Sequence, residues 1–391
     1  MMGSMGNENP HSHSRADDKL GIFSSDVVDR LREAGGVWRL ANGEIRLPRI
    51  FGFCRGVKRA LAMLDEAVRQ HADEGKRLFL LGQIIHNPWV NEYFRRRGVR
   101  ILSADELARL NEVISGDDCA VIPAFGVPLG IERKLRDIGC EIVDTSCGDV
   151  RRLWVWAERA AGSGYSIFIF GRANHDETVV TKSRLAAAGG SYVVAGNLDE
   201  VRSFSELIAG DLPPGRFREL FGPDATNADA LEPFEHLAQV SQTTMLYDDT
   251  MRVREILRDA YARRFGEDAL DERLLFEPTV CHATQDRQAA AVELCRSGCD
   301  LIIVVGGFTS SNTRHLHELA GQFAPAYLIE DASAIRSRNE LATYDFRRDE
   351  PTIAHDWLPE KRPLRVGVLA GASSPETVVG EVLQRLAGFL D

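Results

Sequence analysis

Residues 49–68, RIFGFCRGVKRALAMLDEAV, contain a pattern that occurs twice more in this chain of 391 residues. An extended apolar segment leads to a glycine-flanked turn at Cys54, and the residues that follow place apolar side chains at helical spacing. Residues 140–161, CEIVDTSCGDVRRLWVWAERAA, repeat this plan around Cys147, and residues 275–294, LFEPTVCHATQDRQAAAVEL, repeat it around Cys281. Three lone cysteines far apart in the sequence are therefore predicted to share one local structure.

The shared position of these cysteines indicates a metal site. In parallel α/β sheets, functional groups gather at the carboxyl ends of the strands, and the dipole of a following helix favours a thiolate. Three thiolates would leave one iron of a four-iron cluster without a protein ligand, and such an iron can act on a substrate. Zinc completed by His86 or His175 is the alternative, although structural zinc sites usually contain a CxxC pair.

The other four cysteines occupy different positions. Cys119, Cys140 and Cys299 each precede a predicted strand, and Cys295 lies on a predicted helix four residues before Cys299. These positions favour buried thiols that pack as small apolar side chains. A redox or metal-binding pair of Cys295 and Cys299 is the alternative.

The composition is that of a globular protein, with 44% hydrophobic residues and a net charge of −11. This charge disfavours nucleic acid as a partner, and no apolar run is long enough to span a membrane. The polar N-terminal residues lack the apolar core of a signal peptide, so we expect a cytoplasmic protein. Local basic groups, such as YFRRRGVR at 93–100, indicate either a solvated helix face or contact with an anionic substrate or acidic electron donor.

Strands and helices alternate along the chain, which predicts an α/β fold of βαβ modules with mostly parallel sheets. The threefold pattern predicts three lobes around a central cluster. We expect a disordered or loosely packed extension at 1–42 and a first module at 43–146 that contains Cys54 near its start. A second module is expected at 147–280, with an irregular insertion near 203–233, and a third at 281–391.

Polar groups follow most of the predicted strands. Taken singly, a serine or threonine there is usually only a helix cap, but all of these groups fall at the same end of their strands. Hydroxyls, amides and helix N-termini together can bind phosphate. The candidates are His86, His175, Glu177, Gln242, Thr243, Thr244, Ser310, Ser311, Asn312 and Ser373.

Eight motifs in order resemble the 4-hydroxy-3-methylbut-2-enyl diphosphate reductases, which catalyse the last step of the methylerythritol phosphate pathway of isoprenoid biosynthesis. The motifs are GFCRGVKRA, IIHNPWVNE, IVDTSC, HDET, QTTM, CHATQDRQ, VVGGFTSSNTRHL and AGASSPE. The resemblance covers the chain from about residue 45 to residue 390. The strings PAFG, HDET, QTTM and VVGGF resemble the plant and cyanobacterial branch of this family.

The resemblance implies a three-lobed enzyme with a 4Fe-4S cluster held by Cys54, Cys147 and Cys281. Such an enzyme removes an allylic hydroxyl with two electrons and two protons, and it yields isopentenyl and dimethylallyl diphosphates. An external electron donor such as ferredoxin or flavodoxin is then expected.

The resemblance also implies roles for the polar residues. Glu177 would supply protons, with Thr243 in the relay and His175 lining the pocket. His86, Ser310, Asn312 and Ser373 would hold the diphosphate. Gln242, Thr244 and Ser311 match flanking substrate-binding positions.

Two positions depart from the family pattern. The shorter bacterial branch has a histidine that contacts the diphosphate where this chain has Phe125, so other groups are expected to bind the phosphate here. Family members generally have proline where Gly148 follows Cys147, and glycine gives that backbone more freedom.

Two other functions are compatible with these residues. One is a paralogue that reduces another allylic or oxygenated substrate. The other is an iron-sulfur sensor or electron carrier without substrate chemistry. A carrier has no use for a proton relay, so the set of Glu177, Thr243 and His175 distinguishes it from a reductase.

Overall fold

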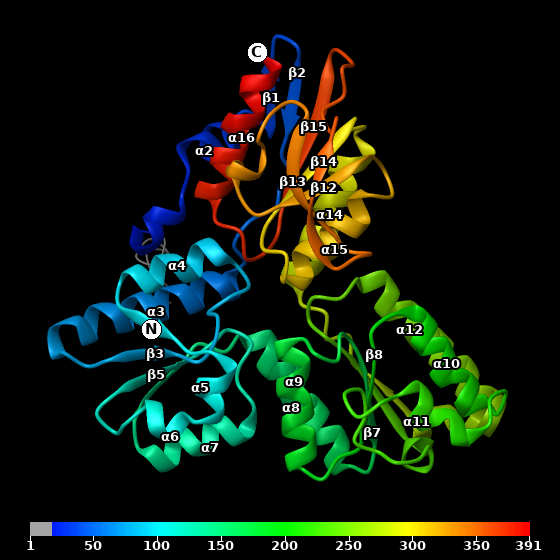
Figure 1. The fold of residues 1–391 in the computed structure, drawn as a ribbon. Helices are drawn as coiled ribbons and strands as arrows, with labels where there is room; N and C mark the ends of the chain where they lie inside the picture. The colour runs from blue at the N-terminus through cyan, green and yellow to red at the C-terminus, as the bar shows by residue number, and fades with distance from the viewer. Residues whose placement is uncertain (1–17) are drawn as a thin grey trace, which may run out of the picture.

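Parallel β-sheets organise the protein into three lobes. The computed structural model describes residues 18–391, and Figure 1 shows the lobes arranged as a trefoil with helices packed on each sheet. Within the three larger sheets, every neighbouring pair of strands is parallel except the pair at the N-terminus. The predicted α/β fold with mostly parallel sheets is confirmed.

The first lobe contains a four-stranded sheet in the order β4-β3-β5-β6. Its strands are β3 (Leu78–Leu80), β4 (Val99–Ile101), β5 (Cys119–Ile122) and β6 (Glu141–Asp144). Its helices are α3 (Arg55–Glu74), α4 (Pro88–Arg96), α5 (Ala104–Ala108), α6 (Leu110–Val113) and α7 (Leu129–Ile138). Apolar side chains from α3, α4, β3 and β5 share one core cluster, which fixes α3 against this sheet.

The second lobe contains a four-stranded sheet in the order β10-β9-β7-β8. Its strands are β7 (Ser166–Phe170), β8 (Tyr192–Ala195), β9 (Leu237–Ser241) and β10 (Leu274–Phe276). Its α-helices are α8 (Gly148–Gly162), α9 (Asp176–Ala187), α10 (Leu198–Ala209), α11 (Phe217–Leu220), α12 (Tyr247–Phe265) and α13 (Leu270–Arg273). Short 3-10 turns are η3 (Pro214–Arg216), η4 (Glu232–Glu235) and η5 (Glu267–Ala269).

The third lobe combines both ends of the described chain in a five-stranded sheet, ordered β1-β2-β15-β11-β12. Its strands are β1 (Val37–Leu40), β2 (Gly43–Arg46), β11 (Leu301–Val305), β12 (Ala326–Ile329) and β15 (Leu364–Ala370). A hairpin of β13 (Glu340–Asp345) and β14 (Glu350–His355) is attached. The helical elements are η2 (Asp18–Phe23), α2 (Asp26–Glu33), α14 (His282–Arg296), α15 (Ser311–Ala320), η6 (Ala332–Ala334) and α16 (Glu376–Leu390).

The N-terminal segment differs from the expected loose extension at 1–42. Residues 1–17 lie outside the described residues, but α2 and β1 are ordered elements of the third lobe. Val28 and Leu31 of α2 are buried in the same core cluster as Val382 and Leu383 of α16. The apolar residues of α2 have helical spacing and form a stripe that needs a partner surface. Moreover, β2 pairs with β15, so the expected first module begins with a strand of the third lobe.

The segment at 203–233 also differs from the expected irregular insertion. Its beginning continues helix α10, and its later part contains α11 and turns that pack inward. Phe217 and Phe221 lie in the core of the second lobe with Phe204. The ring centroids of Phe217 and Phe221 are 5.6 Å apart. Burial of these aromatic side chains orders the segment despite its glycine and proline content.

The four cysteines outside the proposed cluster site occupy the positions that the sequence predicts. Cys119 begins β5, and Cys140 and Cys299 precede β6 and β11. Cys119, Cys140 and Cys295 are buried, and Cys299 is half-buried. Burial raises the pKa of the thiol of Cys295 to about 12, and the nearby Cys299 acts in the same direction.

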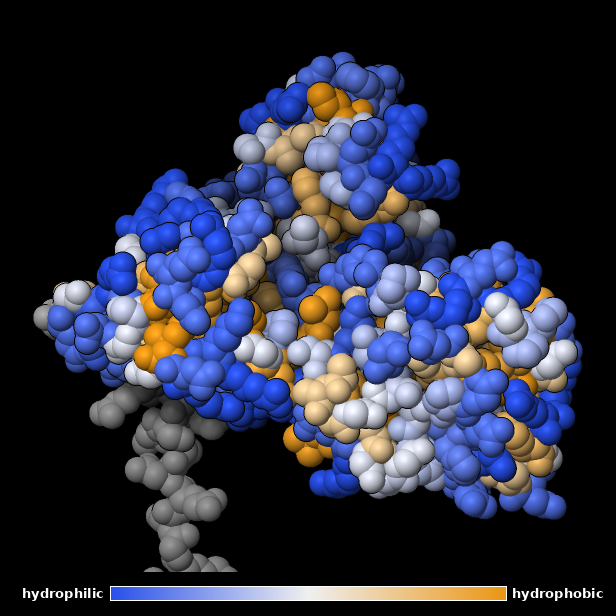
Figure 2. Space-filling view, turned by 60° about the horizontal axis from the view of Figure 1, so that its bottom comes forward, coloured by the Kyte–Doolittle hydropathy of each residue, from blue (hydrophilic) through white to orange (hydrophobic). Residues whose placement is uncertain are grey.

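Most of the molecular face in Figure 2 is hydrophilic, with smaller apolar patches between polar residues. Among residues 18–391, no helix has the length and apolar character needed to cross a membrane.

We predict that Leu31→Ala lowers the free energy of unfolding by about 2–5 kcal/mol, because it leaves a cavity beneath α2. The Leu31 side chain is only 4% exposed. Chemical denaturation followed by circular dichroism measures this change. Glu33→Ala is the control, since Glu33 is exposed on the same helix. Equal stability of the two variants would contradict the packing of α2.

Candidate functional site

Each of the three cysteines is the residue immediately before a helix. Cys54 caps α3, Cys147 caps α8, and Cys281 caps α14. The backbone N–H of Val57 donates to Sγ of Cys54, and that of Thr284 donates to Sγ of Cys281, both at 3.4 Å. These N–H groups and the helix dipole favour negative charge on the sulfur atoms. The predicted turn and helix around each cysteine are confirmed.

The three cysteines also mark the points where the chain passes from one lobe to the next. At Cys54 the chain leaves the third lobe for the first, at Cys147 it enters the second, and at Cys281 it returns to the third. In each case the cysteine N–H donates to a carbonyl beyond a strand of the lobe that the chain is leaving. The pairs are Cys54 to Ala372 at 3.2 Å, Cys147 to Ala124 at 2.7 Å, and Cys281 to Thr243 at 3.0 Å.

A glycine lets two of the cysteines approach each other. A Cβ atom on Gly56 would lie 2.7 Å from Sγ of Cys147 and 3.8 Å from Sγ of Cys54. Any larger residue at position 56 would therefore displace Cys147. Cys281 belongs to the same group, because the charge of Cys54 contributes to raising its pKa.

The environment of these thiols fits a metal cluster. Burial raises the pKa of Cys281 to about 11 and also raises that of Cys147. A bound metal displaces such protons from thiols. Across residues 18–391, one trio of His, Cys, Asp or Glu side chains has its ligand atoms within 4.8 Å of one another, and it contains none of these three cysteines. A multi-atom cluster therefore fits them better than one zinc ion completed by His86 or His175.

Arg287 is a buried cation near two of the cysteines that sequence reasoning did not single out. Its Nε and Nη2 donate to the carbonyl oxygen of Gly52 at 3.1 and 2.7 Å, and its Nη1 donates to that of Ala283 at 2.8 Å. Burial lowers its pKa, whereas negative charge on Cys54 and Cys281 acts in the opposite direction. Its positive charge can thus offset thiolate charge. The CHATQDRQ motif contains Arg287 six residues after Cys281, but helical spacing does not place the two residues on the same face, so the sequence contained no signal for this contact.

Glu177 is a buried carboxyl group whose partners come from another strand end. It lies in the first turn of α9 and is 3% exposed. The backbone N–H of Thr243 donates to its Oε1 at 2.6 Å, and Oγ1 of Thr243 donates to its Oε2 at 2.7 Å. Burial raises the pKa of Glu177 to about 7, and the bonds from Thr243 oppose this shift. The group can therefore exchange a proton near neutral pH.

His175 caps α9 and offers a donor to the site. Burial lowers the pKa of His175 to about 3, so the ring is neutral. Its Nδ1 accepts the backbone N–H of Glu177 at 3.3 Å, which places the proton on Nε2. That Nε2 is buried without a hydrogen-bond partner, so it is available to a ligand.

His86 brings a second imidazole from the first lobe. Its ring meets that of His175 edge to face at 5.3 Å, and Nε2 of His86 also has no hydrogen-bond partner. Asp176 lies beside it, with Oδ2 3.6 Å from that Nε2. The ring of Phe125 stacks on His86 at 4.8 Å with an interplanar angle of 2°. Phe125, which departs from the shorter branch of the family, thus packs against a predicted phosphate-binding residue.

A group of buried hydroxyls lies at the N-terminus of α15. Ser310 caps this helix, and its Oγ lies 3.3 Å from Oγ of Ser373, which follows β15. Ser373 Oγ also lies 3.4 Å from the carbonyl oxygen of His86. Ser311 Oγ is buried without a partner. A Cβ on Gly307 would lie 2.5 Å from that same carbonyl oxygen, so this glycine allows the first and third lobes to meet.

Asn312 connects this hydroxyl group to the cysteines. Its Oδ1 accepts the N–H of Ala372 at 2.9 Å, and its Nδ2 lies 3.4 Å from Oγ1 of Thr284. That hydroxyl is 3.1 Å from Sγ of Cys281. Thr284 is a second residue that sequence reasoning overlooked, although the CHAT string contains it.

Gln242 and Thr244 use their polar groups within the protein. Nε2 of Gln242 donates to Oγ1 of Thr244 at 2.7 Å, and Oε1 of Gln242 accepts the N–H of Arg172 at 3.1 Å. These bonds fix the loop that carries Thr243 against the loop after β7. Both residues therefore support the site through its backbone.

Gly148 has an ordinary environment despite its departure from the family pattern. It is the first residue of α8, and a Cβ there would meet no atom within 4 Å. The first helical position accepts proline readily. Glycine and proline are therefore both compatible with this turn, and the position of Cys147 does not depend on the choice.

Known proteins resemble the chain along nearly its whole length. Residues 45–387 match the family described as LytB protein. A 4-hydroxy-3-methylbut-2-enyl diphosphate reductase of Thermosynechococcus vestitus is 33% identical, with 94% of this chain and 90% of that protein covered. A Gloeobacter violaceus protein of the same name is 34% identical, with 95% and 88% covered. Cyanobacterial relatives agree with the predicted branch.

Solved structures share the fold. A reductase from Plasmodium falciparum superimposes with a TM-score of 0.64 at 21% identity, covering 87% of this chain and 86% of that one. A second structure, of a 4-hydroxy-3-methylbut-2-enyl diphosphate reductase, gives a TM-score of 0.53 at 24% identity, with 88% and 99% covered. With its matched motifs, its extent of similarity and its three-lobed fold, the chain belongs to the LytB protein family.

Proposed function

We propose that this protein reduces 4-hydroxy-3-methylbut-2-enyl diphosphate to isopentenyl and dimethylallyl diphosphates. The reaction combines the substrate with two electrons and two protons, breaks its allylic C–O bond, and releases water. The observation that carries this proposal is a buried carboxyl group with a pKa of about 7, Glu177, in a site where three cysteines begin helices. Curated relatives of this name cover most of the chain.

Cys54, Cys147 and Cys281 would hold a 4Fe-4S cluster. Such a cluster with one iron free of protein ligands supplies electrons and a Lewis acid. The N–H groups of α3 and α14 stabilise the ligand sulfur atoms, and Arg287 balances their charge within a buried region.

The hydroxyl group at the start of α15 would bind the diphosphate. Ser310, Asn312 and Ser373 present neutral donors there, and the N-terminal dipole of the ten-residue α15 favours an anion. His86 and His175 add ring nitrogens without protein partners. A neutral site of this kind binds phosphate through directed hydrogen bonds.

Glu177 would donate the proton that the departing hydroxyl needs. Its protonated form is populated below about pH 7 because burial opposes ionisation. Thr243 holds both carboxyl oxygens and so orients the group. The N–H of His175 is suited to hydrogen-bond the substrate oxygen without itself giving up a proton.

An external redox protein such as ferredoxin or flavodoxin would provide the electrons, and we propose a cytoplasmic location for this exchange. Exposed basic residues near the starts of α3 and α8, next to two of the cysteines, would attract an acidic redox protein to this part of the surface. These residues are Arg55, Arg151 and Arg152.

We predict that Cys54→Ser, Cys147→Ser and Cys281→Ser each remove the cluster from anaerobically prepared protein. The parent should contain about four irons per chain. Iron analysis and the visible absorption spectrum measure this. Cys295→Ser and Cys299→Ser are the controls, and both should keep the parent iron content. Dependence of the iron on Cys295 or Cys299 would refute the assignment.

We predict that Ser373→Ala weakens substrate binding by roughly 1–3 kcal/mol, because one hydrogen bond to a charged group is lost. Ser373 is preferable to Ser310 for this test, since Ser310 also caps α15. Substrate titration and competition by pyrophosphate measure the effect, while the cluster spectrum should stay unchanged. If the parent bound neither substrate nor pyrophosphate, a different substrate or a sensor function would be favoured.

We predict that Glu177→Gln binds substrate and retains the cluster, but loses about 10²–10⁴-fold in turnover. For the parent, kcat/KM should fall as pH rises through about 7, because the raised pKa of Glu177 leaves the proton donor ionised above that value. Stopped-flow assays with excess reductant measure both effects.

Asp176→Asn is the matched control for Glu177→Gln. Asp176 is the adjacent carboxylate on α9 and is exposed, so its loss should change turnover only slightly. Near-normal turnover of Glu177→Gln would remove Glu177 from the mechanism and require a different proton donor.

A further inference from the structure

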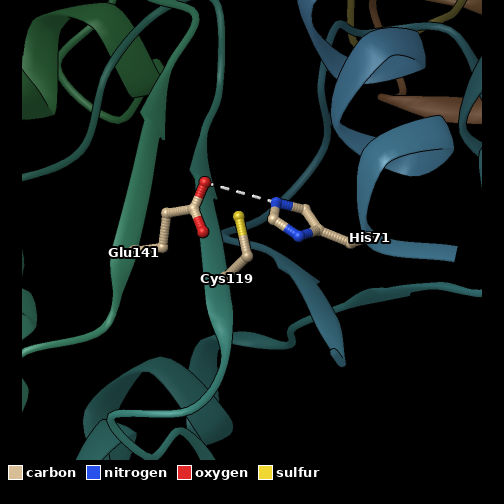
Figure 3. Close-up of side chains that lie close together, drawn as sticks. All are labelled: His71, Cys119 and Glu141. Carbon is tan, nitrogen blue, oxygen red and sulfur yellow. Dashed lines mark ion pairs between the residues drawn. The ribbon is translucent and has the colours of Figure 1, made fainter. Parts of the chain in front are cut away.

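His71, Cys119 and Glu141 form a group of potential metal ligands at the outer end of the first lobe. Their ligand atoms all lie within 4.8 Å of one another, and Figure 3 shows the three side chains converging. His71 lies in the last turn of α3, and Cys119 and Glu141 begin the adjacent strands β5 and β6 as register partners. His71 is 17 positions after Cys54 along α3, a rise of about 26 Å, so this group is remote from the cysteine at the start of the helix.

The hydrogen bonds of His71 leave one ring nitrogen free for a metal. Its side chain is 4% exposed, and Nδ1 lies 3.2 Å from Oε2 of Glu74. Because a carboxylate only accepts hydrogen bonds, Nδ1 carries the proton in the neutral ring, and Nε2 then has a lone pair. A carboxylate that holds one histidine nitrogen in this way is a common support for a metal on the other nitrogen.

The free nitrogen faces a second acceptor. Nε2 of His71 makes no hydrogen bond, yet Oε1 of Glu141 lies 3.3 Å from it. Two acceptors at this distance repel each other unless a cation or a proton lies between them. Ligands about 2.0–2.1 Å from a tetrahedral zinc ion stand about 3.3 Å apart, which matches the observed separation.

Cys119 completes the donor set, and Lys76 does not block it. The Cys119 side chain is fully buried, and its sulfur faces the same space. Lys76 Nζ lies 3.1 Å from Oε2 of Glu141 and 3.1 Å from Oε2 of Glu74, so it pairs with oxygens that the metal does not require. Glu141 is 43% exposed, which gives water access to a fourth coordination position.

We propose that His71, Cys119 and Glu141 bind a divalent transition-metal ion, with zinc the best match to nitrogen, sulfur and oxygen donors. The ion would join the C-terminal end of α3 to the first residues of β5 and β6. It would thereby brace the elements whose other ends lead to Cys54 and Cys147. This structural site is independent of the proposed reductase activity.

Zinc titration of the cluster-loaded, chelator-washed protein tests this proposal. The parent should bind one zinc ion per chain, and cobalt in its place should show a thiolate charge-transfer band. Cys119→Ser should lose that band. Glu141→Gln, which changes an exposed position, should weaken zinc binding at least about 10-fold, and Glu74→Gln should weaken it about 10–100-fold.

Two controls separate this site from other thiols. Cys140→Ser changes a neighbouring buried thiol of the same lobe and should bind zinc like the parent. Cys54→Ser removes a proposed cluster ligand and should retain the cobalt band, whatever the outcome for the cluster. Absence of zinc binding by the parent, or parent affinity in both Cys119→Ser and Glu141→Gln, would overturn the proposal and leave a protonated His71 between two carboxylates.

Discussion

Three backbone hydrogen bonds determine how the lobes meet. Each joins the N–H of a cysteine that begins a helix of one lobe to a carbonyl group of the lobe that the chain has just left. Because Cys54, Cys147 and Cys281 all make this bond, every passage between lobes is fixed at the residue that presents its thiol to the centre. The arrangement of the lobes and the positions of the three cysteines therefore depend on the same hydrogen bonds. A shift of one lobe would break such a hydrogen bond and at the same time move the cysteine that makes it.

Burial at this centre explains the chemistry of the surrounding side chains. Water is largely excluded, so Glu177 keeps its proton to about pH 7, His175 stays neutral, and the thiols of Cys147 and Cys281 resist ionisation. The same burial requires the polar groups to be bonded, and most of them are bonded to one another. Nε2 of His86, Nε2 of His175 and Oγ of Ser311 have no hydrogen-bond partner in the protein. These atoms indicate where a polar ligand would bind.

Sequence reasoning was most successful where one chemical pattern was repeated. The turn and helix at each of the three cysteines were predicted from local spacing, and so was the common strand end of the polar residues. It was wrong about residues 18–42, because β1 is short and pairs with β2, whose other partner, β15, lies more than 300 residues away. The segment 203–233 was also predicted to be irregular, because its glycine and proline residues favour loops. The sequence did not show that three of its phenylalanines pack into the core. Composition does not reveal such distant partners.

The α/β class, the family motifs and the residue types of the site were predictable from the sequence, since local propensity and motif order depend only on neighbouring residues. Tertiary structure alone decided which of those residues use their polar atoms internally, as Gln242 and Thr244 do, and which keep them free, as His86 and His175 do. It also revealed Arg287 beside the cysteines and the convergence of His71, Cys119 and Glu141. The burial of a side chain and its hydrogen-bond partners depend on segments that come into contact only after folding. Local sequence does not predict these contacts.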